Sequence, residues 1–209
     1  MIRVLVVDDH ELVRIGLRYI LADYPAIQIA GEAVDGESAL RMNRQLRPDV
    51  VLLDICLPGL SGFEVTKRLK QASPGLGIVI LSVHEQAPFP AQLLEAGASA
   101  YLTKGCPATE LVEAINTVAR GGRHIGSRIA QQMALNLLPG HGSSPFEELS
   151  AREMEVMLML ADGKVELYEI KWDKLRNAVQ RRIAEKVPMH PVWGRQAAVY
   201  GSGVKFNRC

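Results

Sequence analysis

The chain has 209 residues, 48% of them hydrophobic and 22% charged, with a formal net charge of +1. This composition is that of an ordinary globular protein and excludes collagen-like, coiled-coil and disordered classes. No apolar run approaches the roughly 18 residues that a membrane-spanning helix requires, and three widely spaced cysteines make no disulfide framework, so we expect a cytoplasmic protein with reduced thiols and no membrane partner.

Strand-like and helix-like segments alternate in the N-terminal part of the chain. In chain order the expected strands are residues 4–7, 27–33, 49–53, 77–83 and 98–102, and the expected helices are residues 12–21, 36–46, 62–71, 90–95 and 109–119. This alternation predicts a parallel sheet with helices on both faces. Because right-handed crossovers bring the C-terminal ends of parallel strands to one edge, we expect the functional site there.

Charged and hydroxyl side chains stand at these strand ends. Asp8 and Asp9 follow the first strand, Asp54 follows the third, Ser82 lies in the fourth and Lys104 follows the fifth. Three carboxylates brought together are costly unless a cation neutralises them, and Mg²⁺ suits oxygen ligands. A carboxylate can also act as a nucleophile toward a phosphoryl group, and Asp54 on the central strand is the best candidate acceptor.

Each of these residues has a simpler explanation when it is taken alone. Asp8 and Asp9 could cap the first helix, and Lys104 could be a solvated surface residue. Their joint occurrence at successive strand ends favours the functional interpretation.

Five short motifs carry a resemblance to a known family. They are Val-Val-Asp-Asp-His at residues 6–10, Leu-Leu-Asp at 52–54, Pro-Gly at 58–59, Leu-Ser at 81–82 and Tyr-Leu-Thr-Lys at 101–104. Residues 1–121 therefore resemble a response-regulator receiver domain. The resemblance implies a flavodoxin-like, five-stranded parallel sheet with the strand order 2-1-3-4-5. It also implies that a sensor histidine kinase phosphorylates Asp54.

The resemblance further implies a role for each residue of the site. Asp8, Asp9, Asp54 and the backbone carbonyl of Cys56 would hold Mg²⁺. Lys104 matches the lysine that binds the phosphoryl group in this family. Ser82 matches the switch hydroxyl, and Tyr101 matches the aromatic residue that turns inward on activation.

Residues 122–147 look like a linker, rich in glycine and proline near its ends, with a short helix expected at residues 129–138. Residues 148–164 then resemble the opening of a LuxR-type helix-turn-helix domain, with a capping box formed by Ser150 and Glu153. Taken together with the receiver motifs, this indicates a regulator of the NarL/FixJ family, similar to the GacA/UvrY type.

The family pattern is lost near Lys164. A LuxR-type recognition helix begins near a Ser-x-x-Thr-Val motif, and residues 165–209 contain none. This segment has a formal net charge of +5, against −4 for residues 1–164, and it offers one amphipathic helix at residues 173–187. It is either a frameshift-like product or a divergent native tail, and no DNA-binding residue can be assigned in it.

Two functions from different classes follow, and a third is disfavoured. The first is a phosphorylation-controlled transcription regulator that binds DNA if its output domain is intact and forms a homodimer when phosphorylated. The alternative is a phospho-signalling receiver without working DNA binding. The third is a haloacid-dehalogenase-like phosphatase, but this enzyme class places its nucleophile in Asp-x-Asp after the first strand, whereas the chain has Asp8-Asp9 there and Asp54 after the third.

Overall fold

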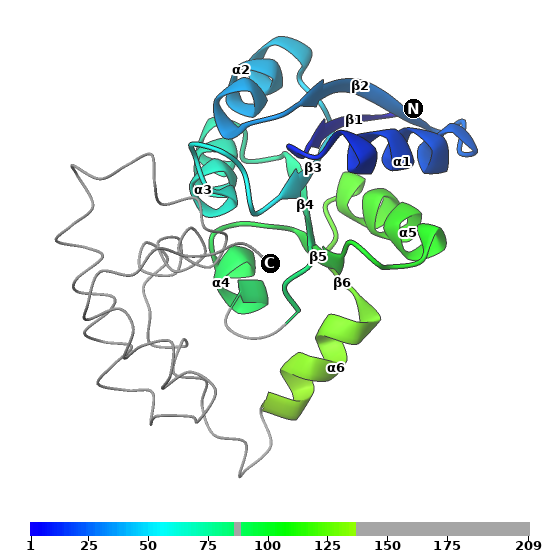
Figure 1. The fold of residues 1–209 in the computed structure, drawn as a ribbon, viewed down its shortest axis with the longest axis vertical. Helices are drawn as coiled ribbons and strands as arrows, with labels where there is room; N and C mark the ends of the chain where they lie inside the picture. The colour runs from blue at the N-terminus through cyan, green and yellow to red at the C-terminus, as the bar shows by residue number, and fades with distance from the viewer. Residues whose placement is uncertain (86–88, 137–209) are drawn as a thin grey trace, which may run out of the picture. The chain divides into compact units, whose positions relative to one another are not determined.

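The computed structural model describes residues 1–85 and 89–136 (Figure 1). The chain divides into two compact units, Met1–Glu147 and Glu148–Cys209, and every described residue belongs to the first. The predictions for residues 148–164 and for residues 165–209, including the helix at 173–187, therefore lie outside the described residues.

Strands and helices alternate along the whole described part of the chain. The strands are β1 Ile2–Val7, β2 Ile27–Ala33, β3 Val50–Asp54, β4 Gly77–Ser82, β5 Ala100–Thr103 and β6 His124–Ile125. The helices are α1 Glu11–Ala22, α2 Gly36–Leu46, α3 Gly62–Ala72, α4 Phe89–Glu95, α5 Ala108–Ala119 and α6 Ser127–Asn136. No helix in this part of the chain is long and apolar enough to cross a membrane.

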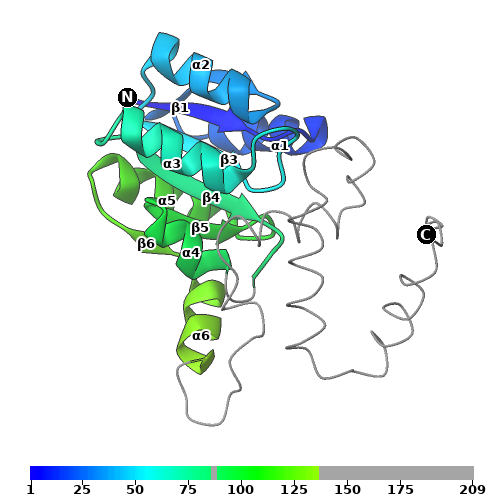
Figure 2. The same ribbon diagram turned by 90° about the vertical axis from the view of Figure 1, so that its left-hand side faces the viewer.

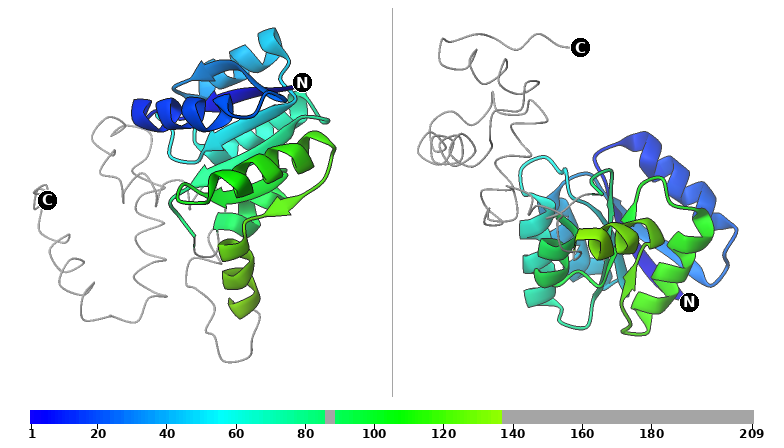
Figure 3. Two further views of the ribbon diagram at one scale, coloured as in Figure 1. Left: turned by 90° about the vertical axis from the view of Figure 1, so that its right-hand side faces the viewer. Right: turned by 90° about the horizontal axis from the view of Figure 1, so that it is seen from below.

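The six strands form one parallel sheet in the order β2-β1-β3-β4-β5-β6. Helices α2, α3 and α4 lie on one face (Figure 2), and α1 and α5 lie side by side on the other (Figure 3, left). Since alternate residues of a strand point to opposite faces, every second residue of β1, β3 and β4 packs against α1 and α5. These strand residues are Val4, Val6, Val50, Leu52, Val79 and Leu81.

The predicted fold class is confirmed, but the predicted number of strands is too low. The sixth strand, β6, pairs with β5 through backbone hydrogen bonds from His124 N to Ser99 O and from Gly126 N to Tyr101 O. It has only two residues and follows Gly121-Gly122, so the sequence contains no apolar run that would indicate a strand there.

Helix α2 shows why some boundaries were predictable. The Asp35 side chain accepts a hydrogen bond from Ser38 N at 2.7 Å, and the Ser38 hydroxyl accepts one from Asp35 N. The bond from Ser38 N lowers the pKa of the Asp35 carboxyl. Such a capping box fixes the start of a helix, and both the strand predicted at 27–33 and the helix predicted at 36–46 have the observed bounds.

Candidate functional site

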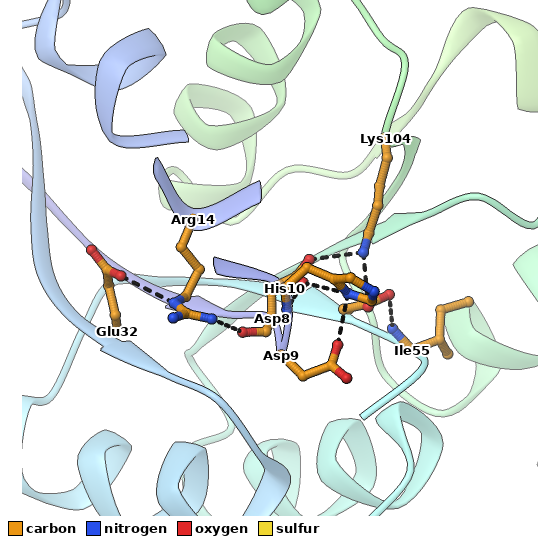
Figure 4. Close-up of polar contacts among 8 residues, drawn as sticks. Asp8, Asp9, His10, Arg14, Glu32, Ile55 and Lys104 are labelled. Atoms are coloured by element: carbon orange, nitrogen blue, oxygen red, sulfur yellow. Dashed lines mark hydrogen bonds and ion pairs between the residues drawn. The ribbon is translucent and has the colours of Figure 1, made fainter. Parts of the chain in front are cut away.

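Three charged side chains meet where β1, β3 and β5 end. Asp8 follows β1, Asp54 is the last residue of β3 and Lys104 follows β5. The Lys104 Nζ atom lies 2.8 Å from Oδ2 of Asp8 and 2.8 Å from Oδ2 of Asp54 (Figure 4). The structure thus brings together residues that lie about 50 positions apart in the sequence, because parallel strands end at one edge of the sheet.

Burial determines the electrostatics of this cluster of Asp8, Asp54 and Lys104, which is called the acidic pocket below. Only 2% of Asp8 and 3% of Asp54 are exposed. Burial raises the pKa of the Asp54 carboxyl, and the hydrogen bond and charge of Lys104 only partly offset this effect. For Lys104, burial disfavours the charged form, but the hydrogen bonds and charges of Asp54 and Asp8 outweigh it and raise the pKa of the ammonium. Lys104 therefore stays protonated between the two carboxyl groups.

The Asp54 carboxylate is held in one orientation by its own loop. Its Oδ1 atom accepts a hydrogen bond from Ile55 N at 2.7 Å, while Oδ2 faces Lys104. The loop then turns back, so that Gly62 N donates to Ile55 O at 3.0 Å. A Cβ atom on Gly62 would lie 2.5 Å from the Ile55 Cα atom, so only glycine allows α3 to begin this close to the acceptor residue.

Asp8, Asp9, His10 and Asp54 form a cluster that could hold a metal ion. Each offers one ligand atom, and the four atoms all lie within 4.8 Å of one another. Buried carboxylates are costly without a cation, and carboxylate oxygens are the donors that hard divalent ions prefer, so these residues fit such an ion. His10 was not among the site residues inferred from the sequence. Its position directly after the aspartate pair was the signal that could have indicated it.

Cys56 lies two residues after Asp54, at the rim of this pocket. It is half-buried, and its Sγ atom lies 3.6 Å from Nε2 of His84. The assignment of its backbone carbonyl as a metal ligand stays a prediction.

Ser82 and Tyr101 are both fully buried and both bind the backbone of His84. The Ser82 Oγ atom accepts a hydrogen bond from His84 N at 2.9 Å, and the Tyr101 hydroxyl donates to His84 O at 2.6 Å. Burial raises the pKa of the Tyr101 hydroxyl. Lys104 N donates to Ser82 O at 2.9 Å, so the pair is also joined to the acidic pocket. His84 was not singled out from the sequence, because its role depends on backbone atoms.

Arg14 on α1 binds the backbone carbonyl of Asp8, whereas Lys104 contacts its carboxylate. Its Nη1 atom donates to the Asp8 carbonyl at 2.8 Å, and its Nε atom lies 3.2 Å from Oε2 of Glu32 on β2 (Figure 4). The helix that follows the aspartate pair is thereby tied back to it. Sequence reasoning missed Arg14, since an arginine on an amphipathic helix usually faces solvent.

Comparison with known proteins identifies the family. Residues 4–116 match the family described as "Response regulator receiver domain". The response regulator GacA of Pseudomonas aeruginosa is 44% identical over 192 residues, which cover 90% of each chain. The response regulator UvrY of Escherichia coli is 47% identical over 165 residues, which cover 78% of this chain and 76% of UvrY.

The fold is matched by a solved structure of the same class. It is a two-component response regulator of the LuxR family from Aurantimonas sp., which superimposes with a TM-score of 0.63 and 37% identity over 65% of this chain and 97% of that chain. The GacA match covers more of the chain than residues 1–164 can supply. The UvrY match covers 78% of this chain, which is about the share that residues 1–164 make up.

Proposed function

Because the chain belongs to the response regulators of two-component systems, we propose that Asp54 accepts a phosphoryl group from a sensor histidine kinase and thereby controls transcription. The observation that carries this proposal is the buried Asp54 carboxylate, which lies 2.8 Å from the Lys104 ammonium among further groups that could ligate a metal ion. In this scheme the protein acts in the cytoplasm as a regulator and not as an enzyme.

The proposed transfer is an in-line displacement at phosphorus. An ionised oxygen of Asp54 forms the new O–P bond while the N–P bond to the kinase imidazole breaks, and the electron pair of that bond leaves with the imidazole nitrogen. Lys104, already beside Asp54, can donate a hydrogen bond to an oxygen of the incoming group. Mg²⁺, held by the carboxylates of Asp8, Asp9 and Asp54 and the carbonyl of Cys56, would neutralise charge on the phosphoryl oxygens.

We propose that Ser82 and Tyr101 respond to the phosphoryl group. Both hold His84, one through its N–H and one through its carbonyl. If the Ser82 Oγ atom moves away from His84 N to donate its proton to a phosphoryl oxygen, His84 N loses its acceptor and the loop after β4 is free to rearrange. The hydrogen bond from the Tyr101 hydroxyl to His84 O then still attaches this loop to β5, so it limits how far the loop moves.

Phosphorylation is tested on the purified full chain. Incubation with acetyl phosphate and MgCl₂ should add one phosphoryl group, seen in the intact-protein mass. Asp54→Ala should lose this product, whereas Asp23→Ala, at an exposed carboxylate after α1, should keep it. Undiminished incorporation in Asp54→Ala would refute the acceptor assignment.

Two functions are candidates for what the phosphorylated protein does. The match to the response regulator GacA over 90% of each chain supports a transcription regulator. For this candidate we propose that the chain dimerises on phosphorylation and binds DNA through its C-terminal region. The absence of a Ser-x-x-Thr-Val motif after Lys164 favours the alternative, a receiver that signals without working DNA binding.

A selection of DNA fragments that bind the purified chain, made from fragmented genomic DNA, distinguishes these two functions. For the transcription regulator, the phosphorylated chain should enrich particular sequences, and its affinity for them should fall as the salt concentration rises. If Asp54 is phosphorylated but no sequence is enriched over random DNA, the alternative holds for this chain. Sequencing the gene around codon 165 then decides whether the tail is native.

A further inference from the structure

The His10 side chain faces the acidic pocket instead of the helix that follows it. His10 is the N-cap residue of α1, yet its side chain makes no capping hydrogen bond. Its Nδ1 atom lies 2.8 Å from Oδ1 of Asp9 and 3.3 Å from Oδ1 of Asp8. We propose that His10 is a nitrogen ligand that makes this pocket prefer divalent transition metals over Mg²⁺. The inference rests on the metal site of the proposed function.

The distances suit ligands of a single ion. Two neighbouring ligands of an octahedral ion, each about 2.1 Å from it, lie about 3.0 Å apart, and opposite ligands lie about 4.2 Å apart. The two separations from His10 Nδ1 fall around the first value, and the complete set with Asp54 lies within 4.8 Å. An ion could therefore replace the contacts of His10 with the two aspartates after small side-chain movements.

Lys104 and His10 contact different carboxylate oxygens of this cluster. Lys104 contacts the Oδ2 atoms of Asp8 and Asp54, whereas His10 contacts the Oδ1 atoms of Asp8 and Asp9. The His10 side chain is also 62% exposed, so its ring is in contact with solvent. The backbone N–H of His10 donates to Oδ1 of Asp8 at 2.8 Å, which fixes the residue beside the carboxylates.

The oxygen and nitrogen ligand atoms of this site determine which divalent metal it binds more tightly. Mg²⁺ selects oxygen ligands and keeps several of its waters, so it gains little from an imidazole. Transition metals bind imidazole well, and sites that contain nitrogen follow the Irving–Williams order. A pocket of three aspartates alone would serve Mg²⁺ and Mn²⁺ with little discrimination, and the added imidazole favours the transition metal.

The test measures metal binding directly on the full chain, without phosphorylation. Mn²⁺ is the probe, because it has little affinity for thiols and the chain has three cysteines. Calorimetry gives the affinities for Mg²⁺ and Mn²⁺, and pulsed electron paramagnetic resonance detects ¹⁴N coupled to bound Mn²⁺. The variants are His10→Gln and, as a control for other imidazoles, His124→Gln on β6.

We expect ¹⁴N coupling in the wild type and in His124→Gln but not in His10→Gln. The ratio of the Mn²⁺ to the Mg²⁺ affinity should fall by about tenfold in His10→Gln, the low end of what losing a supporting group costs a metal site. Absence of ¹⁴N coupling in the wild type, or equal loss of both affinities in His10→Gln, overturns the inference. If the wild type binds neither ion, the metal site of the proposed function fails as well.

Discussion

At the residue scale, the Asp54 carboxyl is buried beside that of Asp8, with Lys104 on one side of the pair. Its pKa is higher in the folded protein than in the unfolded chain, so its ionisation opposes folding. The group that would accept phosphate therefore destabilises the protein that carries it whenever it is charged.

Asp54→Asn removes this charge with little change of shape. In metal-free buffer near neutral pH, we expect the variant to be more stable than the wild type by about 1 kcal/mol. The gain should shrink as the pH falls through the pKa of folded Asp54 and vanish below the ordinary aspartate pKa of about 3.9, where neither state is charged. Urea unfolding across this range measures it, with Asp23→Asn as the exposed control. A variant less stable than the wild type at neutral pH would contradict the expectation.

Tyr101→Phe tests the hydrogen bond to His84. The substitution leaves the His84 carbonyl without the 2.6 Å bond from the hydroxyl, and we expect a loss of about 1 kcal/mol in the free energy of unfolding. Tyr19→Phe, on an exposed tyrosine of α1, is the matched control and should change nothing measurable. Equal urea midpoints for Tyr101→Phe and the wild type would show that the bond contributes no net stability.

The positions of Asp8, Asp54, Ser82 and Lys104 at one sheet edge could be predicted because strand ends follow from topology. The contacts of His10, Arg14 and His84 could not. His10 and Arg14 act through the direction of a side chain, and His84 acts through its backbone. The place of His10 directly after the aspartate pair can be read from the sequence, but neither the direction of a side chain nor a backbone contact can.

At the element scale, several contacts attach helix α6 to the rest of the receiver. The Glu110 side chain on α5 accepts hydrogen bonds from both N and Oγ of Ser127, each at 2.8 Å. The bond from Ser127 N lowers the pKa of the Glu110 carboxyl. Ile129 is fully buried, and Arg128 lies 2.7 Å from Glu85. Helix α6 is thus part of the folded unit, whereas the sequence indicated a helix within a linker.

Glu110→Ala should loosen the start of α6. The variant loses an acceptor for an N–H of the first helical turn, which costs about 1 kcal/mol, so amides of residues 127–136 should exchange with deuterium up to about fivefold faster. Strands β1 and β3 should keep their protection. Glu113→Ala, an exposed carboxylate on the same helix, serves as the control, and equal exchange in the two variants would refute the capping role.

The elements with strong local signals were predicted well, and those that depend on tertiary contact were not. The strand at 27–33 and the helix at 36–46 have a clear apolar pattern and a capping aspartate. The short strand β6 exists only because β5 offers an unpaired edge, and two residues cannot carry a periodic pattern.

At the scale of the whole receiver unit, a chain of contacts leads from the acidic pocket to α6. Lys104 N bonds Ser82 O, Ser82 and Tyr101 hold His84, and the adjacent Glu85 pairs with Arg128. A rearrangement of the loop after β4 therefore changes a contact of the helix that leads toward the C-terminal unit.

We expect phosphorylation to change the stability of α6 through the ion pair between Glu85 and Arg128. Acetyl phosphate with MgCl₂ should alter deuterium exchange of residues 127–136 in the wild type, and the response should be about halved in Arg128→Gln, since exposed ion pairs contribute only a few tenths of a kcal/mol. Arg120→Gln, an exposed arginine after α5, should respond as the wild type does. An unchanged response in Arg128→Gln would exclude the pair as a route.

The strand β6 has a consequence for where this receiver can be joined to another domain. It covers the edge of β5, and a receiver that ended after α5 would expose that edge and invite pairing with other chains. A fusion to another domain made after α6 would keep this edge paired, whereas one made at residue 121 would remove the strand that covers it.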